Sequence, residues 1–76
     1  MKSVTLYVLP ACPYCEHAKQ YLTTHAIPYR EVVVTSEHAL TELHSLGSDS
    51  VPTLVVENKV MRGFNENRLK RWLELT

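Results

Sequence analysis

The sequence predicts a small α/β domain with the element order β-α-β-α-β-β-α, in which a mixed four-stranded sheet carries helices on both faces. Three features of the chain predict this class. Short runs rich in β-branched and aromatic residues alternate with longer segments of helical periodicity. The first strand–helix–strand unit implies a parallel, right-handed crossover. The last two strands are separated by only two residues, which joins them as an antiparallel hairpin.

The first half of the chain begins with a strand and a helix. Residues 3–9 are apolar at nearly every position, which is typical of a central strand covered on both faces. Pro10 ends this strand, and helical periodicity extends from Pro13 to about His25. The inner face of this helix is expected to carry Cys15, Ala18, Tyr21 and Leu22.

A second strand and a second helix follow. Residues 29–34 form the strand, and Thr35 or Ser36 caps a helix that extends to about Leu46. Gly47 is placed to end that helix, because glycine readily adopts the left-handed conformation found after a helix C-terminus. The inward face of the helix is expected to consist of Ala39, Leu40, Leu43 and Leu46.

The last two strands are expected to form a hairpin. The third strand is predicted over Thr53–Glu57 and the fourth over Val60–Arg62. Asn58 and Lys59 between them are predicted to make a two-residue turn.

A bend at Gly63 leads from the hairpin to the last helix. Asn65 is expected to cap this helix, which is predicted over about residues 66–75. Phe64 before the cap and Leu69 within the helix are spaced as a hydrophobic staple. The residues expected to dock this helix on the sheet are Leu69, Trp72 and Leu73.

The composition limits the class of protein. With 76 residues, of which 45% are hydrophobic, the chain is expected to form one domain over residues 1–76. Eight lysine and arginine residues balance eight aspartate and glutamate residues, so no basic excess predicts binding to nucleic acid or to an anionic membrane. No apolar run approaches the roughly 20 residues that span a bilayer, and we see no signal-peptide pattern. We therefore expect a cytoplasmic protein.

The two cysteines of the chain, Cys12 and Cys15, lie between the first strand and the first helix. At this spacing on the first turn of a helix, two sulfurs can form a disulfide without distorting the backbone. Pro13 suits the first helical position, because its missing N–H needs no partner there. Cys12 is then the N-cap, where unpaired N–H groups and the helix dipole favour a thiolate. We predict that Cys12 is the attacking thiolate and that the more covered Cys15 is the resolving thiol.

A zinc site and a pair of inert buried thiols are the alternatives to redox chemistry. Zinc would require further ligands, which His17 or another histidine would have to supply. The closest pair of histidines, His38 and His44, lies in a predicted helix, where these two positions are not neighbours. The cysteine spacing therefore favours a redox dithiol.

Together these motifs resemble those of the glutaredoxin family in the thioredoxin superfamily. Residues 12–15, Cys-Pro-Tyr-Cys, match the dithiol active site of that family, and residues 50–52, Ser-Val-Pro, match its Thr-Val-Pro. Residues 63–65, Gly-Phe-Asn, open the last helix as in that family. The resemblance covers essentially the whole chain and implies a thioredoxin-like fold with a cis peptide bond at Pro52.

By this resemblance, glutathione would lie in a groove beside the two cysteines. Its cysteinyl part would pair with the backbone of Val51, as a short added strand. Its γ-glutamyl carboxylate would meet backbone N–H groups near Phe64 and Asn65, at the start of the last helix. The residues that the resemblance assigns to substrate binding are Pro13, Tyr14, Val51, Pro52, Gly63, Phe64 and Asn65.

Several positions in this groove depart from the residues usual in the family. Leu9 stands where the family commonly has lysine, and Asp49 stands where it often has a basic residue. Arg62-Gly63 replaces Gly-Gly, and Asn65-Glu66 replaces Asp-Asp. These changes remove or reverse charges where glutathione would be held, and Arg62 is a candidate to replace one lost cation.

The resemblance implies a monomeric thiol–disulfide oxidoreductase that reduces protein disulfides or glutathione-mixed disulfides through Cys12 and Cys15. It implies no tightly bound cofactor, with glutathione as co-substrate. The runner-up is a redoxin that receives electrons from thioredoxin reductase and serves ribonucleotide reductase, which the sequence at residues 63–65 also resembles. A third alternative is an iron–sulfur cluster carrier, in which Cys12 and glutathione would hold the cluster between two monomers.

Overall fold

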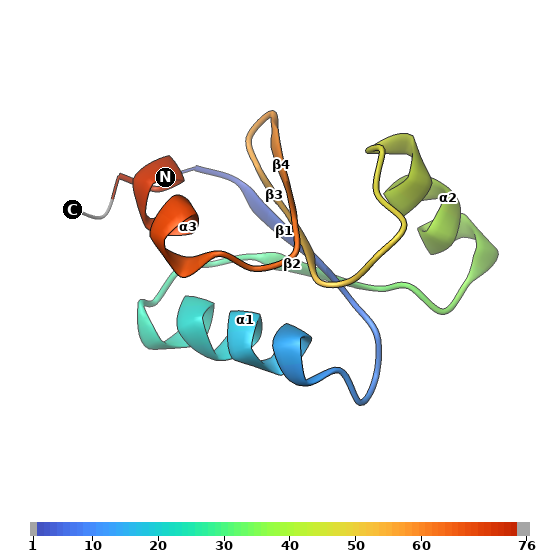
Figure 1. Ribbon diagram of the computed structural model, residues 1–76, viewed down its shortest axis with the longest axis horizontal. Coiled ribbons are helices and arrows are strands. Elements are labelled where there is room, and N and C mark those ends of the chain that lie inside the picture. Colours follow the sequence, from blue (N-terminus) through green and yellow to red (C-terminus); the bar gives the residue numbers. More distant parts are fainter. Residues whose placement is uncertain (1, 75–76) are drawn as a thin grey trace.

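The computed structural model describes residues 2–74, and its elements follow the predicted order (Figure 1). The strands are β1 (Val4–Val8), β2 (Arg30–Val33), β3 (Thr53–Val56) and β4 (Lys59–Arg62). The helices are α1 (Pro13–Thr24), α2 (Glu37–Ser45) and α3 (Glu66–Trp72). The predicted end of the last helix at Leu75 lies outside the described residues, and α3 ends at Trp72 with Leu73 as its C-cap.

The four strands form one mixed sheet in the order β2-β1-β3-β4. β1 pairs in parallel with β2, as a crossover through α1 requires, and pairs in antiparallel with β3. Tyr7 lies opposite Val32 on one side and opposite Thr53 on the other, so β1 is a central strand. The predicted fold class is confirmed, and the C-terminal end of β1 leads directly to the two cysteines.

The hairpin between β3 and β4 turns one residue earlier than predicted. Val56 pairs with Lys59, so the turn residues are Glu57 and Asn58, and Glu57 has a φ of 55°. Asparagine tolerates positive φ better than glutamate does, which is why the sequence pointed to a turn starting at Asn58. The register is instead held by the sheet, where the Glu57 N–H also donates to the Ser3 carbonyl at 3.0 Å.

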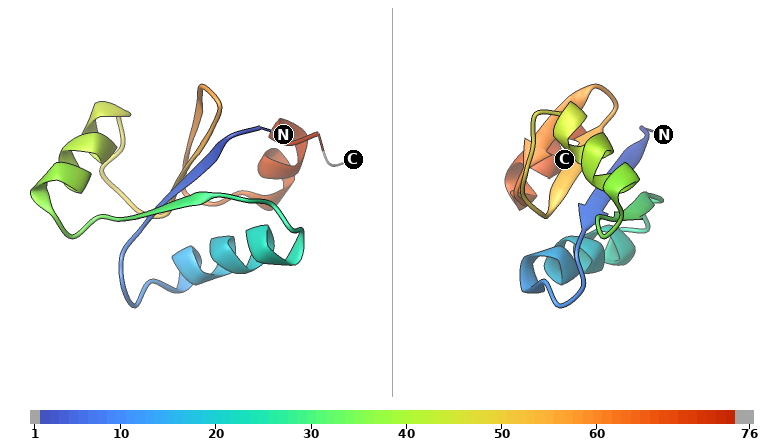
Figure 2. Two further views of the ribbon diagram at one scale, coloured as in Figure 1. Left: turned by 180° about the vertical axis from the view of Figure 1, so that it is seen from behind. Right: turned by 90° about the vertical axis from the view of Figure 1, so that its right-hand side faces the viewer.

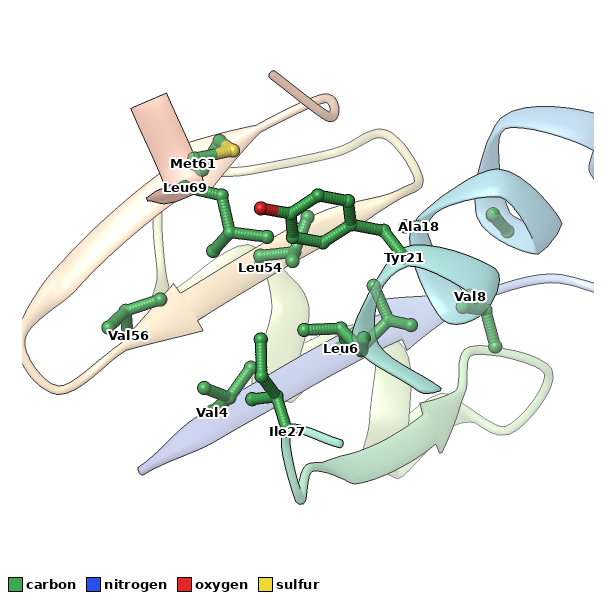
Figure 3. Packing of buried hydrophobic residues seen from close by; sticks show 12 residues of the cluster. Val4, Leu6, Val8, Ala18, Tyr21, Ile27, Leu54, Val56, Met61 and Leu69 are labelled. Atoms are coloured by element: carbon green, nitrogen blue, oxygen red, sulfur yellow. The ribbon is translucent and has the colours of Figure 1, made fainter. Parts of the chain in front are cut away.

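The sheet buries side chains on both of its faces. Figure 3 shows the larger cluster, in which α1 and α3 cover one face. Its buried residues are Val4, Leu6, Val8, Cys15, Ala18, Tyr21, Leu22, Ile27, Leu54, Val56, Met61 and Leu69. The smaller cluster lies under α2 on the other face and consists of Tyr7, Val34, Ala39 and Leu43. Figure 2 shows the three helices distributed around the sheet in this way.

The inward face of α2 is narrower than predicted. Ala39 and Leu43 are buried and Leu46 is partly buried, but Leu40 is 42% exposed. Positions 39, 43 and 46 follow one helical stripe, whereas Leu40 is turned away from it by about a quarter of a turn. Because α2 has only nine residues and packs on a small cluster, this one stripe is enough to hold it.

A polar contact also joins α2 to the two strands beneath it. The Tyr7 hydroxyl donates to Glu42 Oε2 at 2.7 Å, and Arg30 Nη2 donates to the same oxygen at 2.8 Å. The hydrogen bond from Tyr7 lowers the pKa of Glu42. Burial, followed by the hydrogen bond to Glu42, raises the pKa of Tyr7 to about 12. The contact thus stabilises the neutral phenol and the ionised carboxylate together.

Replacing Tyr7 with phenylalanine should remove part of the pH dependence of stability at high pH. Between pH 10 and about 12 a tyrosine in the unfolded chain ionises while Tyr7 in the folded protein stays protonated. The free energy of unfolding should therefore fall as pH rises through this window, by up to about 1.4 kcal/mol per pH unit from this group. Denaturant unfolding of the oxidised wild-type and Tyr7→Phe proteins would measure the difference. Parallel stability curves across the window would contradict the assignment.

Candidate redox site

Cys12 sits at the N-terminus of α1 as the N-cap residue. Its backbone is extended, with φ −112° and ψ 105°, and Pro13 follows as the first helical residue. The Cys15 N–H donates to Cys12 Sγ at 3.2 Å, and the Glu16 N–H donates to the Cys12 carbonyl at 3.0 Å. A sulfur in this position receives an N–H that would otherwise be unpaired in the first turn, which favours a negative charge on it.

The two cysteines are joined as a disulfide and differ in burial. Their Cα atoms are 5.2 Å apart, a separation that a disulfide can span. Cys15 is completely buried against the sheet, within the cluster that α1 covers. Cys12 also packs against that cluster but is only partly buried. A substrate approaching from solvent therefore meets the sulfur of Cys12 first.

The backbone just before Cys12 contains a feature that the sequence did not indicate. Ala11 has a φ of 56°, in the left-handed region that residues other than glycine seldom adopt. Such a residue costs on the order of 1–2 kcal/mol relative to an ordinary backbone conformation. Alanine carries no sequence signal for this conformation. It reverses the chain between the end of β1 and the cap of α1, and so it helps to place Cys12 at the surface.

Two large apolar side chains close to Cys12 along the chain are exposed. Leu9 is 40% exposed and Tyr14 is 73% exposed. Two residues beyond the Tyr7–Thr53 pair, the register of β1 and β3 leads to Leu9 and Val51. Leu9 therefore lies at the end of the sheet where β1 leads to the cysteines and the Val51–Pro52 loop leads into β3.

The Val51–Pro52 loop has a cis peptide bond, as the resemblance implied. Val51 packs against the same cluster as Cys12, and the Pro52 carbonyl accepts a hydrogen bond from the Gly63 N–H at 2.8 Å. Across residues 2–74, the backbone N–H and C=O of Val51 form no hydrogen bond with another residue. This loop therefore presents an unused donor and an unused acceptor.

Two buried hydroxyl groups hold that loop from behind. Ser48 and Thr53 lie with their oxygens 2.7 Å apart, and the Thr53 hydroxyl donates to the Ser50 carbonyl at 2.7 Å. Both side chains are almost completely buried. The sequence did not predict the burial of Ser48, because a serine in a short polar loop is normally exposed.

The segment before α3 packs on α1. The Phe64 ring lies 5.7 Å from the Tyr21 ring and 5.3 Å from the His17 ring, measured between centroids. Asn65 caps α3 as predicted, with Oδ1 accepting from the Arg68 N–H at 2.9 Å. The Asn65 N–H itself donates to the sulfur of Met61 at 3.4 Å, a weak acceptor.

The positions that depart from the family pattern leave few cations near the disulfide. Asp49 is exposed, and Arg62 Nη1 donates to the Gly47 carbonyl at 3.4 Å. The guanidinium of Arg62 is therefore directed toward the loop that follows α2. Gly47 itself has a φ of 79°, which fits its predicted role as the end of that helix.

The part of the chain that the structure describes contains neither a metal-ligand cluster nor a membrane-spanning helix. There, no group of three or more histidine, cysteine, aspartate or glutamate side chains is arranged to hold a metal ion. The zinc alternative therefore finds no ligand set among residues 2–74. None of the helices described is long and apolar enough to cross a membrane.

Comparison with known proteins finds relatives that are similar to this chain in sequence and in fold. A curated protein from Clostridium pasteurianum, an uncharacterized glutaredoxin-like 8.6 kDa protein in a rubredoxin operon, is 29% identical over 73 residues, which is 93% of this chain and 97% of that one. A crystal structure of a mutant thioredoxin-like protein is 31% identical with a TM-score of 0.91, and both chains are covered completely. A glutaredoxin from Archaeoglobus fulgidus is 29% identical with a TM-score of 0.82, covering 96% of this chain and 87% of that one.

The family model named Glutaredoxin matches residues 4–61 of this chain. The matched range includes both cysteines, the Val51–Pro52 loop and every strand apart from the last residue of β4. It therefore contains the whole disulfide site and nearly all of the sheet that supports it. The chain belongs to the glutaredoxin family, whose members are thiol–disulfide oxidoreductases.

Proposed function

We propose that this protein reduces protein disulfides and glutathione-mixed disulfides, with Cys12 as the nucleophile and Cys15 as the resolving thiol. The observation that carries the proposal is the hydrogen bond from the Cys15 N–H to Cys12 Sγ at 3.2 Å, at the N-terminus of a twelve-residue helix. Together with the helix dipole, this contact favours the thiolate that thiol–disulfide exchange needs.

In the proposed reaction, the reduced protein supplies two electrons. The Cys12 thiolate attacks one sulfur of the substrate disulfide, which forms a mixed disulfide and releases the other sulfur as a thiolate that takes up a proton. The Cys15 thiol then loses its proton and attacks the sulfur of Cys12, which releases the second substrate thiol. The substrate gains two electrons and two protons, and the protein returns to the Cys12–Cys15 disulfide.

The order of the two roles follows from burial. Cys15 is completely buried, so a bulky disulfide cannot reach it directly, while the sulfur of Cys12 lies close enough to receive its attack. A resolving thiol that only Cys12 can approach suppresses reaction of Cys15 with solvent thiols. The same arrangement allows a second glutathione to compete with Cys15 at the exposed side of the mixed disulfide.

Glutathione is the proposed co-substrate, held along the Val51–Pro52 loop. The unused N–H and C=O of Val51 suit an added strand such as the cysteinyl part of glutathione. Tyr14 and Pro13 are exposed beside Cys12 and would form the other wall. Gly63, Phe64 and Asn65 would line the place where the γ-glutamyl carboxylate ends. The Phe64 N–H would be its donor, because the N–H groups of Gly63 and Asn65 donate to Pro52 and Met61.

Thioredoxin reductase is a second candidate as electron donor. Three features that disfavour glutathione support it. Leu9 places an exposed apolar side chain where the family commonly has a cation, and Asp49 adds a negative charge to the loop that precedes Val51. Arg62 is hydrogen-bonded to the Gly47 carbonyl. Each of these features weakens the binding of the glutathione carboxylates without affecting the dithiol.

Replacing each cysteine with serine should separate the two proposed roles. Serine is also a good N-cap residue, so Cys12→Ser should keep α1 while removing the nucleophile. We expect Cys12→Ser to lose all disulfide reduction above the uncatalysed rate. Cys15→Ser should still form a mixed disulfide at Cys12 but should stop there when no thiol is added.

The readout is mass spectrometry of the protein after reaction with a peptide disulfide, with circular dichroism as the control for folding. A Cys12→Ser protein that is folded and still active would show that the roles are assigned to the wrong sulfurs. A Cys15→Ser protein that completes turnover without added thiol would show that Cys15 is not needed for resolution.

Restoring a cation at position 9 should improve coupling to glutathione. Leu9→Lys introduces a charge that can pair with a glutathione carboxylate, and an exposed pair of this kind contributes up to about 1 kcal/mol, or roughly fivefold in affinity. We expect the KM for glutathione to fall by about this factor in an assay with glutathione reductase and NADPH. Leu9→Gln, which has a similar length and no charge, is the control. Equal KM values for the two variants would indicate that glutathione does not bind along this side of the site.

A further inference from the structure

The basic residues of this neutral chain are concentrated near its C-terminal end. Five of the eight lysine and arginine residues lie in residues 59–71, where Glu66 is the only acidic residue. We call these five residues the basic surface, and they are Lys59, Arg62, Arg68, Lys70 and Arg71. The formal net charge of zero therefore conceals a separation of charge along the chain.

Ion pairing sharpens this contrast. Each of the three other basic residues holds an ion pair, with N–O distances of 3.6 Å for Lys2, 2.8 Å for Lys19 and 2.8 Å for Arg30. Among residues 2–74, no member of the basic surface forms an ion pair. The positive charge of this surface is thus not neutralised by an ion pair among the described residues, while the positive charge elsewhere is.

The fold gathers these residues on β4 and α3. β4 is an edge strand of the sheet, and Lys59 Nζ lies 5.6 Å from the centre of the Trp72 ring on α3. Arg68 and Arg71 are about one helical turn apart on that helix, and Trp72 directly follows Arg71. Four of the five side chains are exposed, and Lys70 is half-buried. Figures 1 and 2 show α3 beside the β3–β4 hairpin, with α2 at the opposite end of the molecule.

The chain connects the basic surface to the proposed substrate groove. β4 ends at Arg62, and the next residue, Gly63, donates its N–H to the Pro52 carbonyl. Phe64 then crosses α1 and leads into α3. A molecule with its disulfide at Cys12 could therefore extend over the segment from Gly63 to α3, provided that it is larger than glutathione.

We propose that the protein disulfide substrate of this chain carries an acidic segment that binds the basic surface while Cys12 attacks its disulfide. The inference rests on the proposed function and names the class of its substrate. Stabilisation of the α3 dipole would explain Lys70 and Arg71 in the last turn, but not Lys59, Arg62 or Arg68. A nucleic acid is a poorer fit, because its charge repeats every 1.7 Å or so along a rod that would extend over the acidic residues beyond this surface.

The test compares two peptides that each contain one internal disulfide and differ only in charge. One carries glutamates beside the disulfide and the other carries lysines. The fully reduced protein is mixed with each peptide, and the second-order rate of peptide reduction is measured by quenching and thiol alkylation. The rates are measured at increasing salt concentrations. The Debye length falls from about 30 Å at 0.01 M to about 3 Å at 1 M, so salt screens the attraction between charges.

We expect the acidic peptide to react about tenfold faster than the basic peptide at low salt, and this preference should disappear at high salt. The variant Arg68→Gln/Arg71→Gln should lower the rate for the acidic peptide about threefold at 0.1 M salt, where charges more than about 10 Å away are screened. The matched control Thr41→Glu/Ser45→Glu, at two exposed positions of α2, changes the net charge by the same amount and should leave that rate unchanged. Neither pair touches the cysteines or the proposed groove.

A small uncharged disulfide separates this inference from the proposed function. If that disulfide is reduced normally but the two peptides react equally at all salt concentrations, the basic surface does not select substrates and the inference is wrong. If no disulfide is reduced, the proposed function itself fails. Tight binding of a DNA duplex at 0.15 M salt that requires Arg68 and Arg71 would assign the surface to nucleic acid and would also overturn the inference.

Discussion

The contact on which the rest of this structure depends is the one between the Cys15 N–H and the sulfur of Cys12. It exists because Cys12 occupies the N-cap of α1, which places its sulfur at the positive, N-terminal end of the helix dipole. A buried central strand delivers the chain to this point, and Ala11 adopts a left-handed conformation to complete the reversal. A helix anchored by a fully buried Cys15 then keeps the two sulfurs in register.

The opposite wall of the site is held by a different set of forces. Antiparallel pairing of β3 with β1 brings the Val51–Pro52 loop to the side of the disulfide, and the Ser48–Thr53 hydroxyl pair supports it from inside. Buried hydroxyls are favourable only when their hydrogen bonds are satisfied, so this pair fixes one conformation of the loop. The result is a supported loop whose Val51 backbone donor and acceptor bind no other residue in the part of the chain that the structure describes.

Much of this arrangement could be predicted from local sequence, with a few exceptions. Cap residues such as Cys12 and Asn65 were predicted because capping depends on side chains within one turn of the helix. The turn at Glu57, the exposure of Leu40 and the conformation of Ala11 were not predicted. The turn is set by pairing between strands, and the exposure of Leu40 by the small cluster that α2 covers, for both of which propensity is a weak guide. Alanine at position 11 carries no sequence signal for a positive φ.

The burial of Ser48 shows the same limit at the site itself. A serine between a helix and a strand carries the signal of a surface loop, and only its pairing with Thr53 in the folded protein places it inside. The charge separation along the chain does not follow from composition, because equal totals of acidic and basic residues say nothing about their positions. The three-dimensional pairing of Lys2, Lys19 and Arg30 was needed to show which cations are left over.

The central claim is that the N-cap position makes Cys12 the reactive thiolate and that burial keeps Cys15 unreactive until Cys12 is engaged. The most direct measurement is the rate at which iodoacetamide alkylates each cysteine of the reduced protein, followed against pH by peptide mass spectrometry. The alkylation rate of Cys12 should reach half its maximum at a pH well below about 8.5, the usual pKa of a free cysteine. Cys15 should be modified far more slowly. A midpoint at or above that value, or faster modification of Cys15, would contradict the account.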